Sequence, residues 1–260
     1  MSKHSRRNKR FEKNSDNIVV DVGVSVQKKD RSPVVHQRTK LKKPLTIFQR
    51  EFTQRQKDFI SIATDKNTKM MLVSGPAGTG KTYLATWVGL MIMNEKKVSD
   101  LIYIRSAVES ADSKLGYLPG ESEEKMAPYL EPLREKLEEL LPRNDIQLLE
   151  SENRINAIPV GYLRGLNWNV KYIIADEMQN CTTKEIITLM TRVGEFSKIM
   201  ILGDPMQSDI NSKSGFKKIF DAFNDEESKK NGIHTFEFTE QDIVRSELVR
   251  FIVEKIKKLV

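Results

Sequence analysis

The chain is poor in the residues that build disulfides, metal centres and membrane spans. Its 260 residues include one cysteine, Cys181, so no disulfide can form within the chain, and a reducing compartment is indicated. The histidines, at positions 4, 36 and 234, are too scattered to suggest a zinc site. No apolar run approaches the ~20 residues of a membrane span, and the N-terminus has no apolar signal-peptide core. We therefore expect a soluble, cytoplasmic protein with no membrane partner.

Positive charge is concentrated at the N-terminus. The whole chain has a net charge of +7, but residues 1–45 alone carry thirteen Lys and Arg against four Asp and Glu, a net of +9. Residues 46–260 are therefore left with −2. Such an arm either seeks the phosphates of nucleic acid or is a solvated tail, and the charge run does not separate the two. We expect a basic, largely disordered arm over 1–45, strand-like only at 17–26, and one domain over 46–260.

From residue 46 onward, short apolar runs alternate with amphipathic stretches. The pattern predicts five strands, over 70–75, 101–106, 170–177, 198–204 and 234–239. It predicts helices over 52–63, 80–96, most of 121–150, 182–193 and 241–258. Residues 155–160 are short enough to be strand or loop. Apolar strands separated by helices indicate an α/β fold whose parallel sheet is covered on both faces.

Residues 75–82 fit the phosphate-loop pattern G-x-x-x-x-G-K-[ST]. The segment follows a predicted strand and opens a predicted helix, so backbone amides and the positive helix end would face an anion. The alternative is a glycine-rich turn without a ligand. In the phosphate-loop interpretation, Lys81 reaches the β- and γ-phosphates and the Thr82 hydroxyl is a ligand of Mg²⁺. The expected nucleotide contacts are Gly75, Pro76, Ala77, Gly78, Thr79, Gly80, Lys81, Thr82 and Tyr83.

Further polar residues stand where a parallel sheet binds its ligands, at the carboxyl ends of strands. Asp176 is expected to hold Mg²⁺ through water, and Glu177 to orient or deprotonate the attacking water, unless the two only form a solvated turn. Gln207 follows the next strand and would sense the γ-phosphate or position the water, unless it belongs to an ordinary Asp-Pro turn. Gln56 precedes the loop and fits either adenine recognition or an exposed helix position equally well.

Four segments together resemble the PhoH-like family of P-loop ATPases: GPAGTGKTYLA, RSAVESADSKLGYLPG (105–120), DEMQN (176–180) and GDPMQSD (203–209). The LGYLPG element is distinctive, because ATP binding in general does not require it. The resemblance spans about residues 48–255 and implies a RecA-like core, with the five predicted strands in the order 5-1-4-3-2. Some members carry an N-terminal PIN nuclease domain, for which residues 1–45 are too short, so a stand-alone form is expected.

The resemblance also implies individual roles. Gln56 is similar to the Q-motif glutamine of superfamily 1 helicases, Asp176 and Glu177 to the Walker B pair, and Gln207 to the motif III glutamine. Arg245 is the leading arginine-finger candidate, the alternative being a helix-surface arginine in an ion pair. Arg105 and Arg164 match other family arginines that could face nucleic acid, a neighbouring subunit or neither.

The chain has room for one RecA-like domain, whereas a superfamily 1 helicase binds nucleotide between two. A second wall would come from another subunit, and we expect a homo-oligomeric ring, a hexamer, with Arg245 or Arg250 crossing the interface. The expected function is Mg²⁺-dependent ATP hydrolysis coupled to binding or unwinding of RNA, or of DNA. The alternatives are an ATPase that remodels protein partners and a nucleotide-binding module with little turnover; a kinase is disfavoured by the GDPMQ segment.

Overall fold

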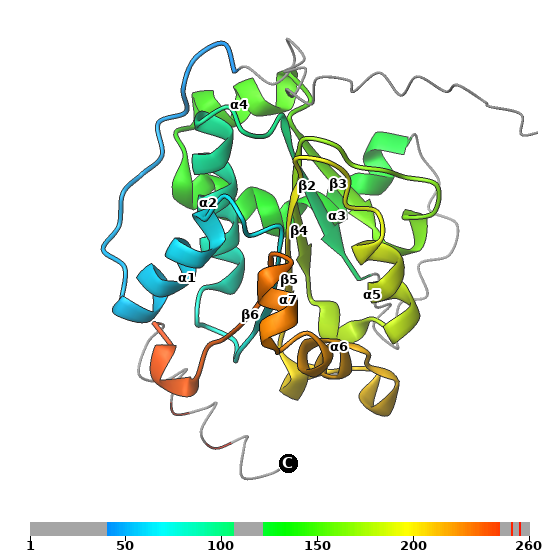
Figure 1. Cartoon of the computed structure of the whole chain (residues 1–260). Coiled ribbons are helices and arrows are strands. Elements are labelled where there is room, and N and C mark those ends of the chain that lie inside the picture. Colours follow the sequence, from blue (N-terminus) through cyan, green and yellow to red (C-terminus); the bar gives the residue numbers. More distant parts are fainter. Residues whose placement is uncertain (1–40, 107–121, 245–250, 252–254, 256–260) are drawn as a thin grey trace, which may run out of the picture. The chain divides into compact units, whose positions relative to one another are not determined.

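In a computed structural model, the described part of the chain comprises residues 41–106, 122–244, 251 and 255 (Figure 1). It contains a six-stranded, fully parallel sheet in the order β3-β2-β4-β5-β1-β6. The strands are β1 (Met70–Ser74), β2 (Asp100–Arg105), β3 (Ile155–Pro159), β4 (Lys171–Asp176), β5 (Lys198–Gly203) and β6 (Ile233–Glu237).

The sheet confirms the predicted order of five strands and adds one at an edge. Residues 155–159, which fit strand or loop in the sequence, form β3 beside β2. This edge position tolerates Pro159, whose missing N–H would break the ladder of a central strand. The register pairs Arg105 with Asp176 and Ser74 with Gly203, so the carboxyl ends of four strands meet at one edge of the sheet.

The helices predicted over 52–63, 80–96 and 182–193 are present with slightly shifted ends. The main helices are α1 (Gln54–Thr64), α2 (Lys81–Asn94), α3 (Ser122–Leu140), α4 (Arg143–Ser151), α5 (Thr183–Met190), α6 (Phe216–Ala222) and α7 (Glu226–Lys230). Pro142 divides the predicted 121–150 helix into α3 and α4, and α6 and α7 are additions. The predicted 241–258 helix falls mostly outside the described residues; residues 240–242 form a 3-10 turn.

Two apolar cores sandwich the sheet because alternate strand residues face opposite sides. One core joins Leu101, Tyr103 and Ile174 of the strands to α1, α2, α3 and α4. The other joins Ile102 and Ile173 to α5 and α6. Figure 1 shows α1 and α2 on one side of the sheet and α5 and α6 on the other. Among the described helices, none has the length and hydropathy required to cross a bilayer.

The segment before α1 is anchored to the domain. Leu41 and Leu45 are buried, and the Asn94 side chain accepts a hydrogen bond from the Leu45 N–H (2.8 Å) and donates one to its carbonyl (3.0 Å). The Thr46 N–H donates to Asp145 (2.7 Å). Residues 41–45, which the charge pattern assigns to the arm, thus contact the domain. The rest of the arm, with the strand predicted at 17–26, lies outside the described residues.

Candidate nucleotide-binding site

The loop between β1 and α2 has the backbone that its glycines allow. Gly80 has φ +86°, a left-handed conformation that side chains disfavour, and α2 begins at the next residue. At Gly75, an added Cβ would lie 2.7 Å from the Cβ of Phe238, so only glycine fits the close approach of the segment after β6. The loop is therefore shaped at both ends by positions that require glycine.

Lys81 lies folded into this loop. Its Nζ donates to the carbonyls of Gly75 (2.6 Å) and Pro76 (3.1 Å). Burial lowers the pKa of Lys81, and the carboxylates of three nearby acids oppose that shift: Asp204, Asp176 and Glu177. The side chain is thus a partly desolvated cation next to the loop backbone, placed to meet a phosphate oxygen in exchange for two carbonyls.

Asp176, at the end of β4, is held by hydrogen bonds to both of its oxygens. Oδ2 accepts from the Thr82 hydroxyl (2.9 Å) and from the Tyr103 hydroxyl (2.8 Å), and Oδ1 accepts from the Glu177 N–H (3.0 Å). Burial, followed by the proximity of Asp176, strongly raises the pKa of Tyr103, which therefore stays a proton donor. The Thr82 hydroxyl donates in this contact and its oxygen still has lone pairs of its own, so the donor set fits Mg²⁺ bound directly by Thr82 and through water by Asp176.

Glu177 stands at the turn after β4 with a strained backbone. Its φ of +57° is left-handed, a conformation that costs a non-glycine residue about 1–3 kcal/mol. The Gln179 Nε2 donates to the Glu177 carboxylate (2.6 Å), and its Oε1 accepts from the Asp204 N–H (3.0 Å). Gln179 therefore connects the turn after β4 to the turn after β5, which carries Gln207.

Asp204 changes one detail of the expected anion nest. Its carboxylate accepts from the N–H of Ala77 (3.1 Å) and caps the following 3-10 turn through the Met206 N–H (3.0 Å). Burial raises the pKa of Asp204, while Lys81 and these two amides lower it. The Ala77 amide is therefore directed at a carboxylate in this structure, not into open space for a phosphate.

The opposite end of the site is built from four parts of the chain. The segment before α1 provides Arg50, whose guanidinium carbon lies 5.2 Å from the centre of the Tyr83 ring on α2. Helix α3 provides Lys136 and Glu139, joined at 2.6 Å. Gln56 on α1 is buried; its Oε1 accepts from the Thr53 N–H (3.1 Å), and its Nε2 lies close to Gly80.

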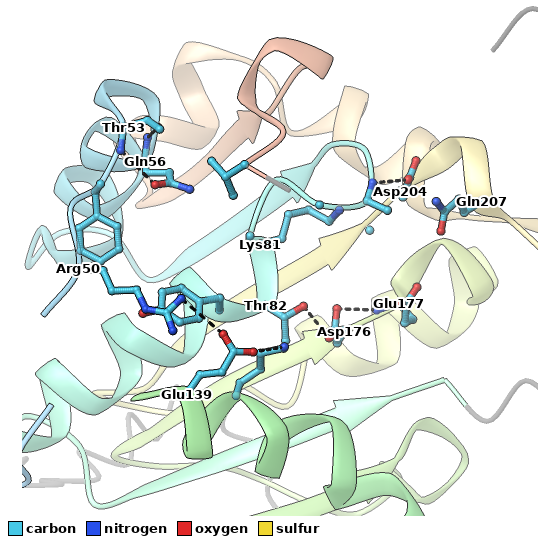
Figure 2. A pocket seen from close by; sticks show the side chains of 18 of the residues that line it. Arg50, Thr53, Gln56, Lys81, Thr82, Glu139, Asp176, Glu177, Asp204 and Gln207 are labelled. Atoms are coloured by element: carbon cyan, nitrogen blue, oxygen red, sulfur yellow. Dashed lines mark hydrogen bonds and ion pairs between the residues drawn. The ribbon is translucent and has the colours of Figure 1, made fainter. Parts of the chain in front are cut away.

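Both ends open into one cavity of about 490 Å³ (Figure 2). Figure 2 shows Arg50 and Glu139 at one end, Asp204 and Gln207 at the other, and Lys81 and Thr82 between them. Sequence-predicted residues in the lining are Gln56, Ala77, Gly78, Gly80, Lys81, Thr82, Tyr83, Asp176, Glu177 and Gln207.

Other predicted residues lie elsewhere. Gly75, Pro76 and Thr79 do not line the cavity, and the buried Thr79 hydroxyl donates to the Pro76 carbonyl (2.9 Å). Arg105 is half-buried at the end of β2, and Arg164 is exposed. The arginine-finger candidates Arg245 and Arg250 lie outside the described residues.

Sequence patterns did not single out several residues that the structure brings to the site. Tyr103 reaches Asp176 from a neighbouring strand, 73 residues away in sequence. Its signal is a polar-tipped aromatic residue in an otherwise apolar strand. Arg50 and Glu139 carry no local signal, because only the packing of α3 and of the segment before α1 against α2 brings them to Tyr83.

A phosphate loop between the central strand and its helix, faced by carboxylates at the end of β4, defines a nucleotide-binding P-loop NTPase domain with a RecA-like sheet. The sequence of residues 49–257 matches the family model described as "PhoH-like protein". The chain belongs to the PhoH-like protein family.

Several relatives share this domain. The chain is 35% identical over 223 residues to a PhoH-like protein of Mycobacterium tuberculosis (strain ATCC 25618 / H37Rv), covering 85% of this chain and 59% of that protein. It is 34% identical over 206 residues to a PhoH-like protein of Bacillus subtilis (strain 168), covering 79% and 63%. Protein PhoH of Escherichia coli (strain K12) is 31% identical over 187 residues, covering 70% and 51%. The chain spans between half and two thirds of these relatives' length.

A solved structure titled "Structural Basis for DNA Unwinding at Forked dsDNA by two coordinating Pif1 helicases" aligns with 73% of this chain and 44% of that one. The TM-score is 0.32 and the identity 13%, a similarity too remote to bear on function.

Proposed function

We propose that this domain hydrolyses ATP with Mg²⁺. The observation that carries the proposal is the position of the Glu177 carboxylate. It lines the same cavity as the phosphate loop, next to Asp176, and is fixed by a hydrogen bond from Gln179. A module that only binds nucleotide has no need of a second carboxylate beyond the one that serves the metal.

Each polar group at this end has a task in that reaction. Lys81 would leave the carbonyls of its own loop and neutralise the β- and γ-phosphates. Thr82 and Asp176 would hold Mg²⁺, which, when bound, neutralises charge on the phosphate oxygens. Glu177 would orient the attacking water and accept its proton, and Gln207, exposed at the cavity, would contact the terminal phosphate or that water.

The replacement Glu177→Gln tests the proposal. It keeps the size and the Gln179 contact but removes the base, so ATP should still bind while kcat falls by about 10²-fold or more. Steady-state phosphate release and equilibrium titration with ATP measure the two quantities. Glu195→Gln, at an exposed loop position, is the matched control and should behave as wild type. Equal turnover in the Glu177→Gln variant and wild type would contradict the role of Glu177.

We further propose that hydrolysis is coupled to RNA, or to DNA, in a homo-oligomeric ring. The basic arm supports the coupling to nucleic acid. The turn after β3 supports it as well, because it exposes Tyr162 (70%) and Arg164, and such side chains stack on bases and pair with phosphates. Two exposed apolar side chains support the ring, because a neighbouring subunit would cover them: Val244 (53% exposed), which lines the cavity, and Met206 (61%), which precedes the lining residue Gln207.

A further inference from the structure

The end of the cavity remote from the phosphates has a defined chemistry. The phosphate end gathers Lys81, Asp176 and Glu177, whereas the far end combines an aromatic ring, two cations and the Glu139 carboxylate. A nucleotide whose terminal phosphates meet Lys81 would extend its nucleoside away from Asp176 and Glu177, toward the end of the cavity that Tyr83 lines. The far end is therefore where the sugar and base would lie.

Glu139 is held in place but still accessible. Lys136 donates to its Oε1 at 2.6 Å, and Arg50 lies 3.8 Å from its Oε2. Its side chain is 38% exposed, so the carboxylate keeps acceptor capacity toward the cavity that it lines. The two flanking cations fix the orientation of the carboxylate, which an acceptor of a ligand's hydroxyl groups requires.

Tyr83 gives an independent observation at this end. Its hydroxyl oxygen is buried and has no hydrogen-bond partner among the described residues. Its ring already has one face against the Arg50 guanidinium. A ring and a guanidinium in this arrangement form a stacking pair for a planar group, such as a nucleobase.

We propose that Glu139 reads the ribose of the bound nucleotide by accepting hydrogen bonds from its 2′- and 3′-hydroxyl groups. An ionised carboxylate only accepts, and a vicinal diol offers two donors that match its two oxygens. The edge of the base has another candidate partner in Gln56, whose Nε2 lies near Gly80 at the other side of the loop. This inference rests on the proposed function, and it makes the substrate a ribonucleotide in preference to a deoxyribonucleotide.

Calorimetric titration of the full chain with ADP and 2′-deoxy-ADP tests the proposal without turnover. Wild type should bind ADP about tenfold more tightly, because the deoxy analogue loses a hydrogen bond to a charged group. Glu139→Ala should reduce this ratio of affinities to about one, mainly by weakening the binding of ADP. The ratio for Glu139→Gln should lie between those of wild type and Glu139→Ala. Glu135→Ala, an exposed position one turn earlier on α3, should keep the wild-type ratio. Inorganic tripolyphosphate should bind all four proteins equally.

The outcomes separate this inference from the proposed function. If wild type binds neither ADP nor ATP nor tripolyphosphate, the proposed function itself is wrong. If it binds all of them but does not distinguish ADP from 2′-deoxy-ADP, only the role of Glu139 is wrong. A Glu139→Ala variant that binds ADP and 2′-deoxy-ADP more weakly by the same factor also overturns the role of Glu139. So does a variant that loses affinity for GDP but not for ADP, because that result would assign Glu139 to the edge of the base.

Discussion

Gln179 is the uncharged residue on which the reactive end of the cavity depends. It donates to the Glu177 carboxylate and accepts from the Asp204 N–H, so it fixes both strand-end turns at once. Gln179 is buried, whereas Glu177 is only half-buried. Glu177 also has a left-handed backbone conformation, which residues other than glycine disfavour. The orientation of Glu177 is therefore set by its neighbour as much as by its own backbone.

We predict that Gln179→Ala lowers kcat by about tenfold to a hundredfold and changes the KM for ATP little. The substitution frees the Glu177 carboxylate to rotate away from the water without touching the phosphate loop. Steady-state kinetics over a range of ATP concentrations separate kcat from KM. Gln147→Ala, at an exposed position of α4, is the control. An unchanged kcat in Gln179→Ala would show that Glu177 is held without it.

Residues that act through a local pattern could be predicted, and residues that act through packing could not. The loop at 75–82 and the Asp176–Glu177 pair are each continuous in sequence, with a required strand before them. Tyr103 and Glu139 join the site from β2 and α3, and their residue types are ordinary for a strand and for a helix surface. Ala77 shows a further limit, because the Asp204 contact that captures its amide spans 127 residues.

At the scale of elements, the segment before α1 is fastened by Asp145 in the first turn of α4. The buried Asp145 carboxylate accepts from the Thr46 N–H and lies 3.1 Å from the Lys43 Nζ. We predict that Asp145→Ala lowers the free energy of unfolding by about 2 kcal/mol at pH 7, since it removes a buried charged acceptor. Urea unfolding measures the loss. Asp221→Ala, which breaks an exposed pair with Lys217, should cost less than about 1 kcal/mol.

The pH dependence of this contribution has a definite sign. Burial alone would raise the pKa of Asp145, but the hydrogen bond from Thr46 and the proximity of Lys43 outweigh it and lower the pKa below 3.8. A carboxyl whose pKa is lower in the folded state stabilises the fold above its unfolded pKa, and this stabilisation is lost as the pH falls through the folded value. The gap between wild type and Asp145→Ala should therefore narrow below about pH 4. A gap that stays constant down to pH 3 would contradict the assignment.

The elements that the sequence predicts well are those whose burial is visible in their composition. The four central strands are continuous apolar runs because helices cover both faces. Residues 155–160 were ambiguous since β3, at the edge of the sheet, carries exposed Asn156 and ends in proline. Helix α6 buries Phe216, Ile219 and Phe220 at helical spacing, yet it is only seven residues long, too short for periodicity to stand out.

At the scale of the whole molecule, one RecA-like domain leaves Gln207 and Met206 exposed beside the cavity. A head-to-tail neighbour that covers them would close into a ring. We predict that light scattering with Mg-ATP detects particles several times the mass of the 29.9 kDa chain, and that Met206→Asp shifts them toward single chains. Ile187→Asp, at an exposed apolar position on α5, is the control. A single 30 kDa species with Mg-ATP at working concentration would contradict the ring.

The uneven charge of the chain leads to the last prediction. The domain carries −2 and the arm +9, so sequence-independent attraction to nucleic acid should come from the arm. A variant with the first basic cluster changed to glutamine (Lys3, Arg6, Arg7, Lys9 and Arg10) should bind single-stranded RNA more weakly. The slope of log affinity against log salt should become shallower by up to about 0.7 per lost phosphate contact, while ATP hydrolysis without RNA stays unchanged. Fluorescence anisotropy at several salt concentrations measures the slope. An identical slope in the two proteins would reduce the arm to a solvated tail and move the search for the nucleic-acid surface to Tyr162 and Arg164.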